Sequence, residues 1–202
     1  MPDITSAPVA LILVAVLGYL LGSIPFGIVI ARLFGLGDLR QIGSGNIGAT
    51  NVLRTGNKLA AFLTLIGDAG KGGAAVLIAR FLIGEDAAQV AGFFAFLGHC
   101  FPVFLRFKGG KGVATWLGTM LALSFPLGLA ACGAWLVTAV IFRISSLSAL
   151  VAAALSPMVA LLLGKGSLTF LAAALAVLIF YRHKANITRI LKGEEPKIGK
   201  KE

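Results

Sequence analysis

Long apolar runs separated by short polar segments constrain this chain more than any other feature of its sequence. The runs cover residues 8–34, 58–82, 87–105, 111–124, 126–143, 146–163 and 167–183. A helix needs about 20 mainly apolar residues to cross a bilayer, within a range of about 17–25. Backbone groups in lipid must be satisfied within their own segment, which favours helices. The sequence therefore predicts an all-α, polytopic integral membrane protein with seven transmembrane helices, forming a single domain over residues 1–202.

Local features modify two of these runs. Ser23 and Pro25 interrupt the first run within the segment GSIPFG, and Gly18 and Gly22 have the GxxxG spacing that lets two helix backbones approach closely. The fourth run is short and ends before Pro126, so we expect it to span only part of the bilayer or to enter it obliquely. No Lys or Arg precedes the first run, which therefore lacks the basic region of a cleaved signal peptide and is expected to remain as a helix.

The distribution of charge predicts the orientation. Asp, Glu, Lys and Arg make up 13% of the chain, whereas about a quarter is usual in soluble domains. With the N-terminus outside, the expected cytoplasmic segments hold most of the 18 Lys and Arg, and the expected outside segments hold only Arg80 and Lys165. Cytoplasmic loops carry an excess of Lys and Arg. We therefore expect an external N-terminus and a cytoplasmic C-terminus.

The net charge of +10 limits the kinds of partner. Basic residues close to a membrane attract anionic headgroups, and we expect Lys197, Lys200 and Lys201 in the tail to contact them. The basic residues are divided among short segments between apolar runs, and they do not form one soluble basic module, which argues against nucleic acid. The charge therefore indicates anionic lipids or anionic substrates at the cytoplasmic face.

The segment GSGNIGATN at 43–51, followed by Arg54, does not resemble an ordinary connecting loop. Glycine permits positive φ angles, and successive backbone N–H groups in such a loop can converge on an anion. The glycines also match GxGxxG, but no strand precedes them and Asp68 falls in an apolar run. The βαβ context of a dinucleotide-binding fold is therefore absent. Two interpretations remain, an anion-binding loop and a flexible polar turn.

The segment FKGGKGVAT at 107–115 combines Lys108 and Lys111 with three glycines. A nucleotide-binding Walker A loop would require Gly at 105 and Ser or Thr at 112, where this chain has Leu105 and Gly112. Lysine acts as a mobile positive charge toward phosphates or carboxylates. A basic anchor at the cytoplasmic surface would explain Lys108 but not the glycines.

The segment RHKANITR at 182–189 follows the last run. His183 and Asn186 are three residues apart, so on a helix both side chains can reach one polar ligand. A histidine at a membrane interface can also be purely structural, and both interpretations stay open at this point.

Charged residues also occur inside an apolar run. Asp68 and Lys71 lie three residues apart in the second run, and such charges usually face the bundle interior, where they pair or serve function. We expect pairing. The two cysteines, Cys100 and Cys132, are expected to be small buried apolar residues. No Cys or His cluster has metal-ligand spacing and no cofactor motif occurs, so we expect neither a metal nor a cofactor.

The chain resembles the bacterial acyl-phosphate-dependent glycerol-3-phosphate acyltransferases of the PlsY type. The resemblance rests on three segments in the same order, GSGNIGATN with Arg54, FKGGKGVAT and HKANITR. GSIPFG, GDAGKG, LGHCFPVF and ISSL match this family too, so the resemblance covers nearly the whole chain. It implies a multi-pass enzyme of the bacterial inner membrane, with its active site on the cytoplasmic face. The enzyme would use acyl phosphate and glycerol 3-phosphate to make 1-acyl-glycerol 3-phosphate and phosphate, the first acylation of phospholipid synthesis. Membrane lipids and a functional link to the enzyme that produces acyl phosphate are implied as well.

The resemblance also implies the residues of the site. Glycerol 3-phosphate would contact Arg54, Lys111, Ser146 or its neighbour Ser145, His183 and Asn186. Acyl phosphate would contact Ser44, Gly45, Asn46, Gly48, Ala49, Thr50, Asn51, Gly110 and Gly112. The catalytic residues would be Lys111, Ser146, His183 and Asn186.

The chemistry of the substrates agrees with this assignment. Phosphate is a good leaving group, so the protein mainly has to position two anions, while lysine and backbone N–H groups can stabilise the tetrahedral oxyanion. Other acyltransferases rely on His followed five residues later by Asp, but here Phe104 follows His99 and Thr188 follows His183 at that spacing. The resemblance implies that the phosphate of glycerol 3-phosphate takes the hydroxyl proton, with His183 as a base the lesser hypothesis.

Two other classes of protein compete with this interpretation. A small organic-phosphate transporter would also need basic loops and intramembrane charges, but the polar loops gather on one face and no matched discontinuous helices mark a midplane site. A structural subunit of a membrane complex would explain the hydrophobicity but not three glycine-rich basic loops.

Overall fold

The computed structural model describes residues 3–199, which form helices joined by turns and short loops, with no strand in this range. The α-helices are α1 (Pro8–Gly22), α2 (Phe26–Leu33), α3 (Ala49–Leu53), α4 (Lys58–Leu82), α5 (Glu85–Cys100), α6 (Val113–Leu123), α7 (Phe125–Phe142), α8 (Ser145–Leu162), α9 (Thr169–Arg182) and α10 (Lys184–Leu191). Short 3-10 helices lie at η1 (Leu39–Gln41), η2 (Val103–Leu105) and η3 (Gly166–Leu168). The predicted all-α class is confirmed. Lys200 and Lys201 of the basic tail lie outside the described residues.

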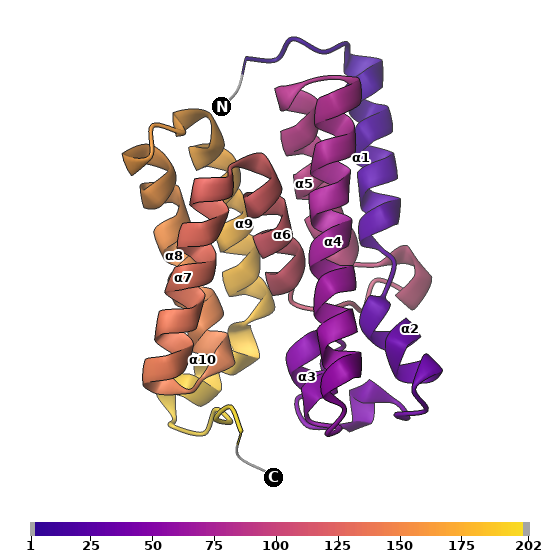
Figure 1. The fold of residues 1–202 in the computed structure, drawn as a ribbon, viewed down its shortest axis with the longest axis vertical. Coiled ribbons are helices and arrows are strands. Elements are labelled where there is room, and N and C mark those ends of the chain that lie inside the picture. The colour runs from indigo at the N-terminus through magenta and orange to yellow at the C-terminus, as the bar shows by residue number, and fades with distance from the viewer. Residues whose placement is uncertain (1–2, 200–202) are drawn as a thin grey trace.

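The long helices lie side by side along the length of the molecule (Figure 1). α1 packs on α5, α4 packs on both α5 and α6, and α7, α8 and α9 pack in succession. The short helices α2, α3 and α10 lie at the same end of the bundle, where the described chain finishes, and we call this the polar end. The turns between α4 and α5 and between α8 and α9 lie at the opposite end (Figure 1).

The membrane-spanning segments agree with the apolar runs of the sequence. Segments long and apolar enough to cross a membrane are Pro8–Leu33, Lys58–Leu82, Glu85–Leu105, Phe125–Phe142 and Ser145–Leu162. The bent pair Gly166–Arg182 and Lys184–Leu191 can provide a further span, and Val113–Leu123 is a shorter apolar helix, as expected for the fourth run. The chain therefore has several apolar helices suited to a membrane, while the number seven and the orientation of the termini stay predictions.

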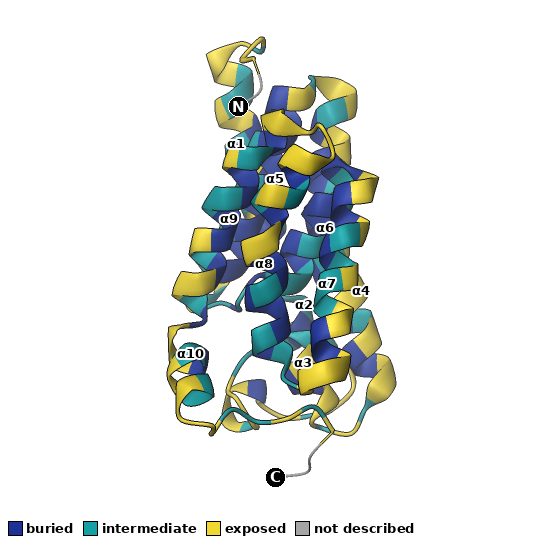
Figure 2. Ribbon diagram, turned by 90° about the vertical axis from the view of Figure 1, so that its left-hand side faces the viewer, coloured by how far each residue is buried: buried dark blue, intermediate teal, exposed yellow. Residues whose placement is uncertain are grey.

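Many large apolar side chains on the long helices are exposed, and Figure 2 shows that exposed positions recur along the length of these helices. Phe81 is 89% exposed and Leu162 is 77% exposed, and both lie on long helices. A soluble monomer rarely presents large apolar areas to water, whereas a membrane-facing surface requires them. The burial pattern therefore supports lipid contact around the bundle.

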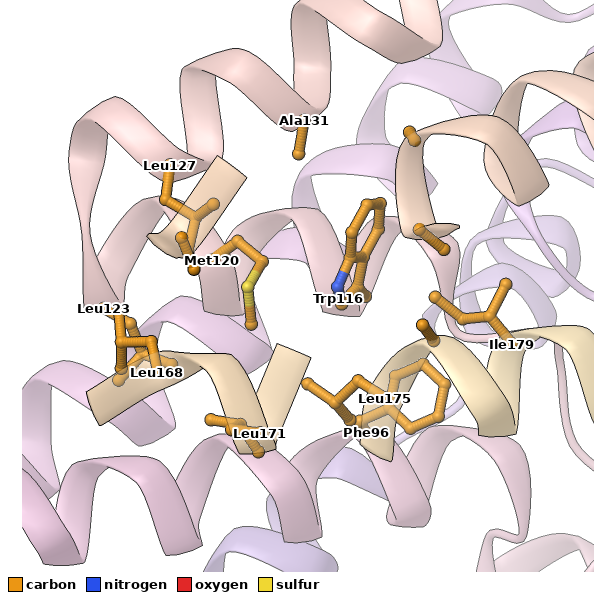
Figure 3. Packing of buried hydrophobic residues seen from close by; sticks show 14 of the residues in the cluster. Phe96, Trp116, Met120, Leu123, Leu127, Ala131, Leu168, Leu171, Leu175 and Ile179 are labelled. Carbon is orange, nitrogen blue, oxygen red and sulfur yellow. The ribbon is translucent and has the colours of Figure 1, made fainter. Parts of the chain in front are cut away.

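The main core is formed by residues of α4 to α9 (Figure 3). Its largest fully buried side chains are Phe96, Trp116, Met120, Leu127, Leu175 and Ile179. They come from α5, α6, α7 and α9, so the core fixes the relative positions of helices that carry parts of the polar end.

Small residues let α1 lie directly against α5. A Cβ on Gly18 would lie 2.9 Å from the Ala91 carbonyl oxygen, and a Cβ on Gly22 would lie 2.1 Å from the Ala95 carbonyl oxygen. Any larger side chain at Gly22 would therefore separate the two helices. The predicted close packing through the GxxxG pair is confirmed.

A buried charge cluster lies where the first run breaks between α1 and α2. Asp68 Oδ1 is 2.9 Å from Lys71 Nζ and 3.4 Å from His99 Nδ1. Lys71 Nζ also donates a hydrogen bond of 2.8 Å to the carbonyl oxygen of Ile24, between the two helices. The expected pairing of Asp68 with Lys71 is confirmed, and it joins α4, α5 and the break in one network.

We expect Asp68→Asn to destabilise the protein, because it leaves the Lys71 ammonium buried without its counter-charge. Removing one member of a buried ion pair typically costs about 3–5 kcal/mol of unfolding free energy. Thermal unfolding in detergent measures the effect. The double variant Asp68→Leu with Lys71→Met is the control and should lose less stability than Asp68→Asn, because no uncompensated charge remains. Equal stability of Asp68→Asn and the native chain would contradict this role.

Candidate active site

Segments that are far apart in the sequence meet at the polar end of the bundle (Figure 1). They are the loop 43–51, whose last residues begin α3, the loop 106–112 before α6, the start of α8, and the junction of α9 with α10. Each of these segments contains residues that the sequence assigns to the site. The contacts described below join all four.

Asn51 gives the loop 43–51 its shape. Gly43 and Gly45 adopt positive φ angles of 48° and 67°, which favour glycine. The Asn51 residue is 1% exposed, and both its side-chain oxygen and its side-chain nitrogen form hydrogen bonds within residues 39–51. It accepts from the N–H (3.1 Å) and Oγ (3.3 Å) of Ser44 and donates to the carbonyl oxygens of Leu39 (2.9 Å) and Asn46 (2.7 Å). The loop is therefore an ordered structure, and the flexible-turn interpretation does not describe it.

The same loop contacts Arg54 and the start of α8. Gly48 precedes α3, whose first residues are Ala49 and Thr50. Thr50 Oγ1 lies 3.4 Å from Ser145 Oγ. A Cβ on Gly43 would lie 2.6 Å from Cδ of Arg54, so the absence of a side chain there lets the arginine lie against the loop.

The glycines of the loop 106–112 are required by close packing against α5. A Cβ on Gly109 would lie 2.2 Å from the carbonyl oxygen of His99, and a Cβ on Gly110 would lie 2.2 Å from His99 Nε2. Gly112 has a φ of 81°, and its Cβ would lie 2.2 Å from the ring of Phe96. The loop therefore runs tightly along the end of α5, and the position of Lys111 between Gly110 and Gly112 is fixed by that path.

A bend of 66° separates α9 from α10, with His183 between them. His183 and Asn186 are 2% and 3% exposed. His183 Nδ1 lies 2.7 Å from the carbonyl oxygen of Ile179. A carbonyl oxygen only accepts, so Nδ1 carries the proton and Nε2 of the neutral ring is left as an acceptor. His183 precedes the first residue of α10 and Asn186 lies in its first turn, so both residues are at the same helix end, as expected.

Glu195 is a member of the cluster that the sequence analysis did not anticipate. Its side chain is 8% exposed, and it comes from the tail after α10. One carboxylate oxygen accepts hydrogen bonds from Ser146 Oγ (2.7 Å) and Asn186 Nδ2, and the other accepts from Arg189 Nε (2.7 Å). Glu195 therefore links α8 to α10. An acidic pair, Glu194 and Glu195, inside an otherwise basic tail was the available signal.

The cluster is strongly cationic around this carboxylate. Burial lowers the pKa of Lys111 to about 8, Glu195 opposes this shift, and the cations Arg189, Arg54 and Arg182 add to it. Burial raises the pKa of Glu195, but the hydrogen bonds from its three partners outweigh burial, so its pKa lies below the usual value. Glu195 therefore stays ionised at neutral pH, and the Lys111 charge is lost as the pH rises through about 8.

A hollow of about 450 Å³ opens between the two glycine-containing loops. It is lined by Arg40, Gly45, Ile47, Phe107, Lys108, Gly109 and Arg182. Three of these residues are cationic, which suits an anionic group. Within residues 3–199, no group of three His, Cys, Asp or Glu side chains lies together as a metal site would require.

These features define a class of protein. Apolar helices form a membrane bundle, and its polar end holds ordered glycine loops, several cations and buried hydroxyl, amide and imidazole groups. Such a site is built to bind phosphorylated molecules beside a bilayer.

Comparisons with known proteins agree with this class. The sequence profile described as glycerol-3-phosphate acyltransferase matches residues 12–193. Glycerol-3-phosphate acyltransferases from Jannaschia sp. (strain CCS1) and Cereibacter sphaeroides (strain ATCC 17025 / ATH 2.4.3) are 71% and 67% identical to this chain. The first alignment covers 98% of both chains, and the second covers 100% of this chain and 96% of the relative. The chain belongs to the glycerol-3-phosphate acyltransferase family and is an acyltransferase.

Solved structures of the same family support this assignment. A crystal structure of PlsY, an integral membrane glycerol 3-phosphate acyltransferase, in its glycerol 3-phosphate form, has a TM-score of 0.88 and 41% identity, and the match covers 94% of this chain and 96% of that one. The lysophosphatidic acid form of PlsY has a TM-score of 0.87 and 40% identity, covering 94% and 95%. The resemblance inferred from the sequence motifs is confirmed, and the transporter alternative receives no support.

Proposed function

We propose that this acyltransferase takes its acyl group from an acyl phosphate and transfers it to the 1-hydroxyl of glycerol 3-phosphate. The products are 1-acyl-glycerol 3-phosphate and phosphate. The observation that carries the proposal is the meeting of two separate glycine loops and several cations at one end of the bundle. Two phosphorylated substrates would each require such a loop, whereas an acyl donor without an exposed phosphoryl group at its reacting end would require only one.

The two substrates occupy adjacent parts of the polar end. Glycerol 3-phosphate contacts Arg54, Lys111, His183, Asn186 and the serine pair at the start of α8. The acyl phosphate lies over the loop 43–51, with Ser44 and Thr50 toward its phosphoryl group and the backbone of Gly110 and Gly112 beside it. Asn51 shapes this loop through its internal hydrogen bonds. Thr50 and Ser145 lie 3.4 Å apart, so the two subsites are contiguous.

The reaction is an acyl transfer through a tetrahedral intermediate. The hydroxyl oxygen of glycerol 3-phosphate bonds to the acyl carbon, the bond from that carbon to the phosphate oxygen breaks, and phosphate leaves. The hydroxyl proton passes to the phosphate of glycerol 3-phosphate. Lys111 stabilises the oxyanion electrostatically, and the remaining residues hold two mutually repelling anions in reacting distance. Ser146 and Asn186 are catalytic through this positioning.

The membrane arrangement belongs to the same proposal. The polar end faces the cytoplasm of the bacterial inner membrane, with seven spans, the N-terminus outside and the C-terminus inside. The concentration of Lys and Arg at the polar end supports this orientation. The acyl phosphate then comes from an enzyme on the cytoplasmic side.

His183→Gln is expected to lower kcat/KM while leaving the shape of the pH–rate profile unchanged. The Nδ1–H bond to Ile179 leaves Nε2 as an acceptor for a glycerol hydroxyl, and glutamine keeps an acceptor near that position. Because a protein general base contributes about 10²–10⁴-fold, we expect a smaller loss than that. Disappearance of the acidic limb in His183→Gln would instead identify His183 as the base.

The test of the function is phosphate release by the purified protein in detergent. The assay contains palmitoyl phosphate with or without glycerol 3-phosphate, and a parallel assay offers palmitoyl-CoA in place of palmitoyl phosphate. We expect release that requires both palmitoyl phosphate and glycerol 3-phosphate, and no acylation from palmitoyl-CoA. Acylation of glycerol 3-phosphate by palmitoyl-CoA alone would overturn the proposed donor.

A further inference from the structure

Arg182 connects the loop that carries Lys111 to the helix end that carries His183 and Asn186. It is the last residue of α9 and immediately precedes His183. Its Nε donates a hydrogen bond of 3.0 Å to the carbonyl oxygen of Gly110, and its Nη2 donates one of 2.9 Å to the carbonyl oxygen of Gly109. One guanidinium therefore holds two consecutive carbonyls, directly before Lys111.

The orientation of this guanidinium is itself fixed. The guanidinium carbon of Arg182 lies 5.1 Å from the ring centroid of Phe101, which follows α5. Stacking on an aromatic face and donation through a rigid fork are properties of arginine that lysine does not share. The contact with Phe101 therefore limits the directions in which the two hydrogen bonds can point.

Hydrogen bonds hold the two glycines of this loop from two sides. Gly109 and Gly110 have no side chains, so they can approach α5 closely. On that side, the Gly110 N–H donates a hydrogen bond of 3.1 Å to the carbonyl oxygen of His99. Among the described residues, Arg182 supplies the hydrogen bonds to the two glycine carbonyls. One side of the loop is thus tied to α5, and the other is tied to the end of α9.

We propose that Arg182 is a positioning residue: its guanidinium, held by Phe101 and bound to the Gly109 and Gly110 carbonyls, sets the position of Lys111 relative to His183 and Asn186. This inference rests on the proposed function, in which those three residues act on the substrates. Arg182 contributes through the loop, and no direct contact with the reacting atoms is required. Displacement of a positioned group by about 1 Å can cost about 100-fold in rate.

The experiment compares Arg182→Lys and Arg182→Ala with the native protein in the assay of palmitoyl phosphate and glycerol 3-phosphate. Arg106→Ala is the matched control, because Arg106 is exposed and belongs to the same loop. We expect kcat to fall at least about tenfold in both Arg182 variants, with the thermal unfolding midpoint close to that of Arg106→Ala. Guanidinium chloride at sub-denaturing concentration should raise the kcat of Arg182→Ala, with no increase for the native protein or for Arg106→Ala.

The outcomes separate this inference from the proposed function. If the native protein itself releases no phosphate, the proposed function fails. If the native protein is active and Arg182→Lys, which keeps the charge but not the fork, has native kcat, the positioning role is wrong. Loss of activity in Arg182→Ala that guanidinium does not restore, together with a lowered unfolding midpoint in both Arg182 variants, would make Arg182 a structural residue only.

Discussion

Lys111→Ala is expected to lower kcat/KM by about 10²–10³-fold, the usual effect of removing one group that stabilises an oxyanion. The lysine is held between Gly110 and Gly112 in a loop that packs too closely against α5 to move freely. Phosphate release from palmitoyl phosphate, measured over a range of glycerol 3-phosphate concentrations, separates the loss in kcat from the change in KM.

Lys108→Ala is the matched control for this variant. Lys108 belongs to the same loop but is exposed and lines the hollow beside the site. We expect its removal to affect activity far less than the removal of Lys111. Equal losses in the two variants would show that the loop contributes only general positive charge.

The pH dependence of the native enzyme provides a second measurement of Lys111. Since burial lowers the pKa of Lys111 to about 8, the ammonium is present below that pH and is lost above it. Activity should therefore decline as the pH rises through about 8. Lys111→Arg keeps its charge at any accessible pH, so this decline should move to higher pH or disappear in that variant, whatever its absolute rate.

Truncation after Gly193 is expected to reduce activity by about 10–100-fold, whereas truncation after Glu195 should leave catalysis largely intact. The shorter chain lacks the carboxylate that binds Ser146, Asn186 and Arg189. A hydrogen bond to a charged group contributes about 1.5–3 kcal/mol, and its loss frees two side chains of the proposed site. The two truncations differ by only two residues, so initial rates and thermal unfolding of the pair isolate this effect.

Single substitutions distinguish the carboxylate from the rest of the tail. Glu195→Gln keeps the shape but places an amide N–H₂ near donors, so we expect a partial loss, while Glu194→Gln at an exposed neighbour should be silent. Full activity of the chain truncated after Gly193 would contradict a role for Glu195. Inactivity of the chain truncated after Glu195 would instead assign a role to the residues beyond it.

The positions of the apolar helices along the chain were predictable because they depend on local sequence. Apolar runs predicted α4 at its observed bounds, and Ser23 and Pro25 predicted the break between α1 and α2. The spacing of Asp68 and Lys71 predicted their pairing, because residues three apart meet on a helix. The two glycine loops could also be identified from local sequence, because several glycines close to lysine are unusual in an ordinary connecting loop and indicate anion binding.

The contacts that join the loops could not be predicted, because they depend on how distant segments pack. Nothing in the local sequence places Glu195 against Ser146, whose partner lies 49 residues away. The sequence alone suggested no role for Arg182, yet it binds the carbonyls of Gly109 and Gly110. The packing of Gly110 against His99 was hidden as well, because glycine does not reveal what lies beside it.

Exposed apolar side chains continue along the bundle to the polar end, where Leu59 lies at the start of α4 and Phe142 at the end of α7. If the donor is the acyl phosphate proposed above, its fatty tail would stay in the leaflet while its anionic head enters the site, and donor and enzyme would meet within the plane of the membrane. Saturation by the donor would then depend on its mole fraction among the surrounding lipids, whereas glycerol 3-phosphate, which comes from water, would be counted by its concentration in solution.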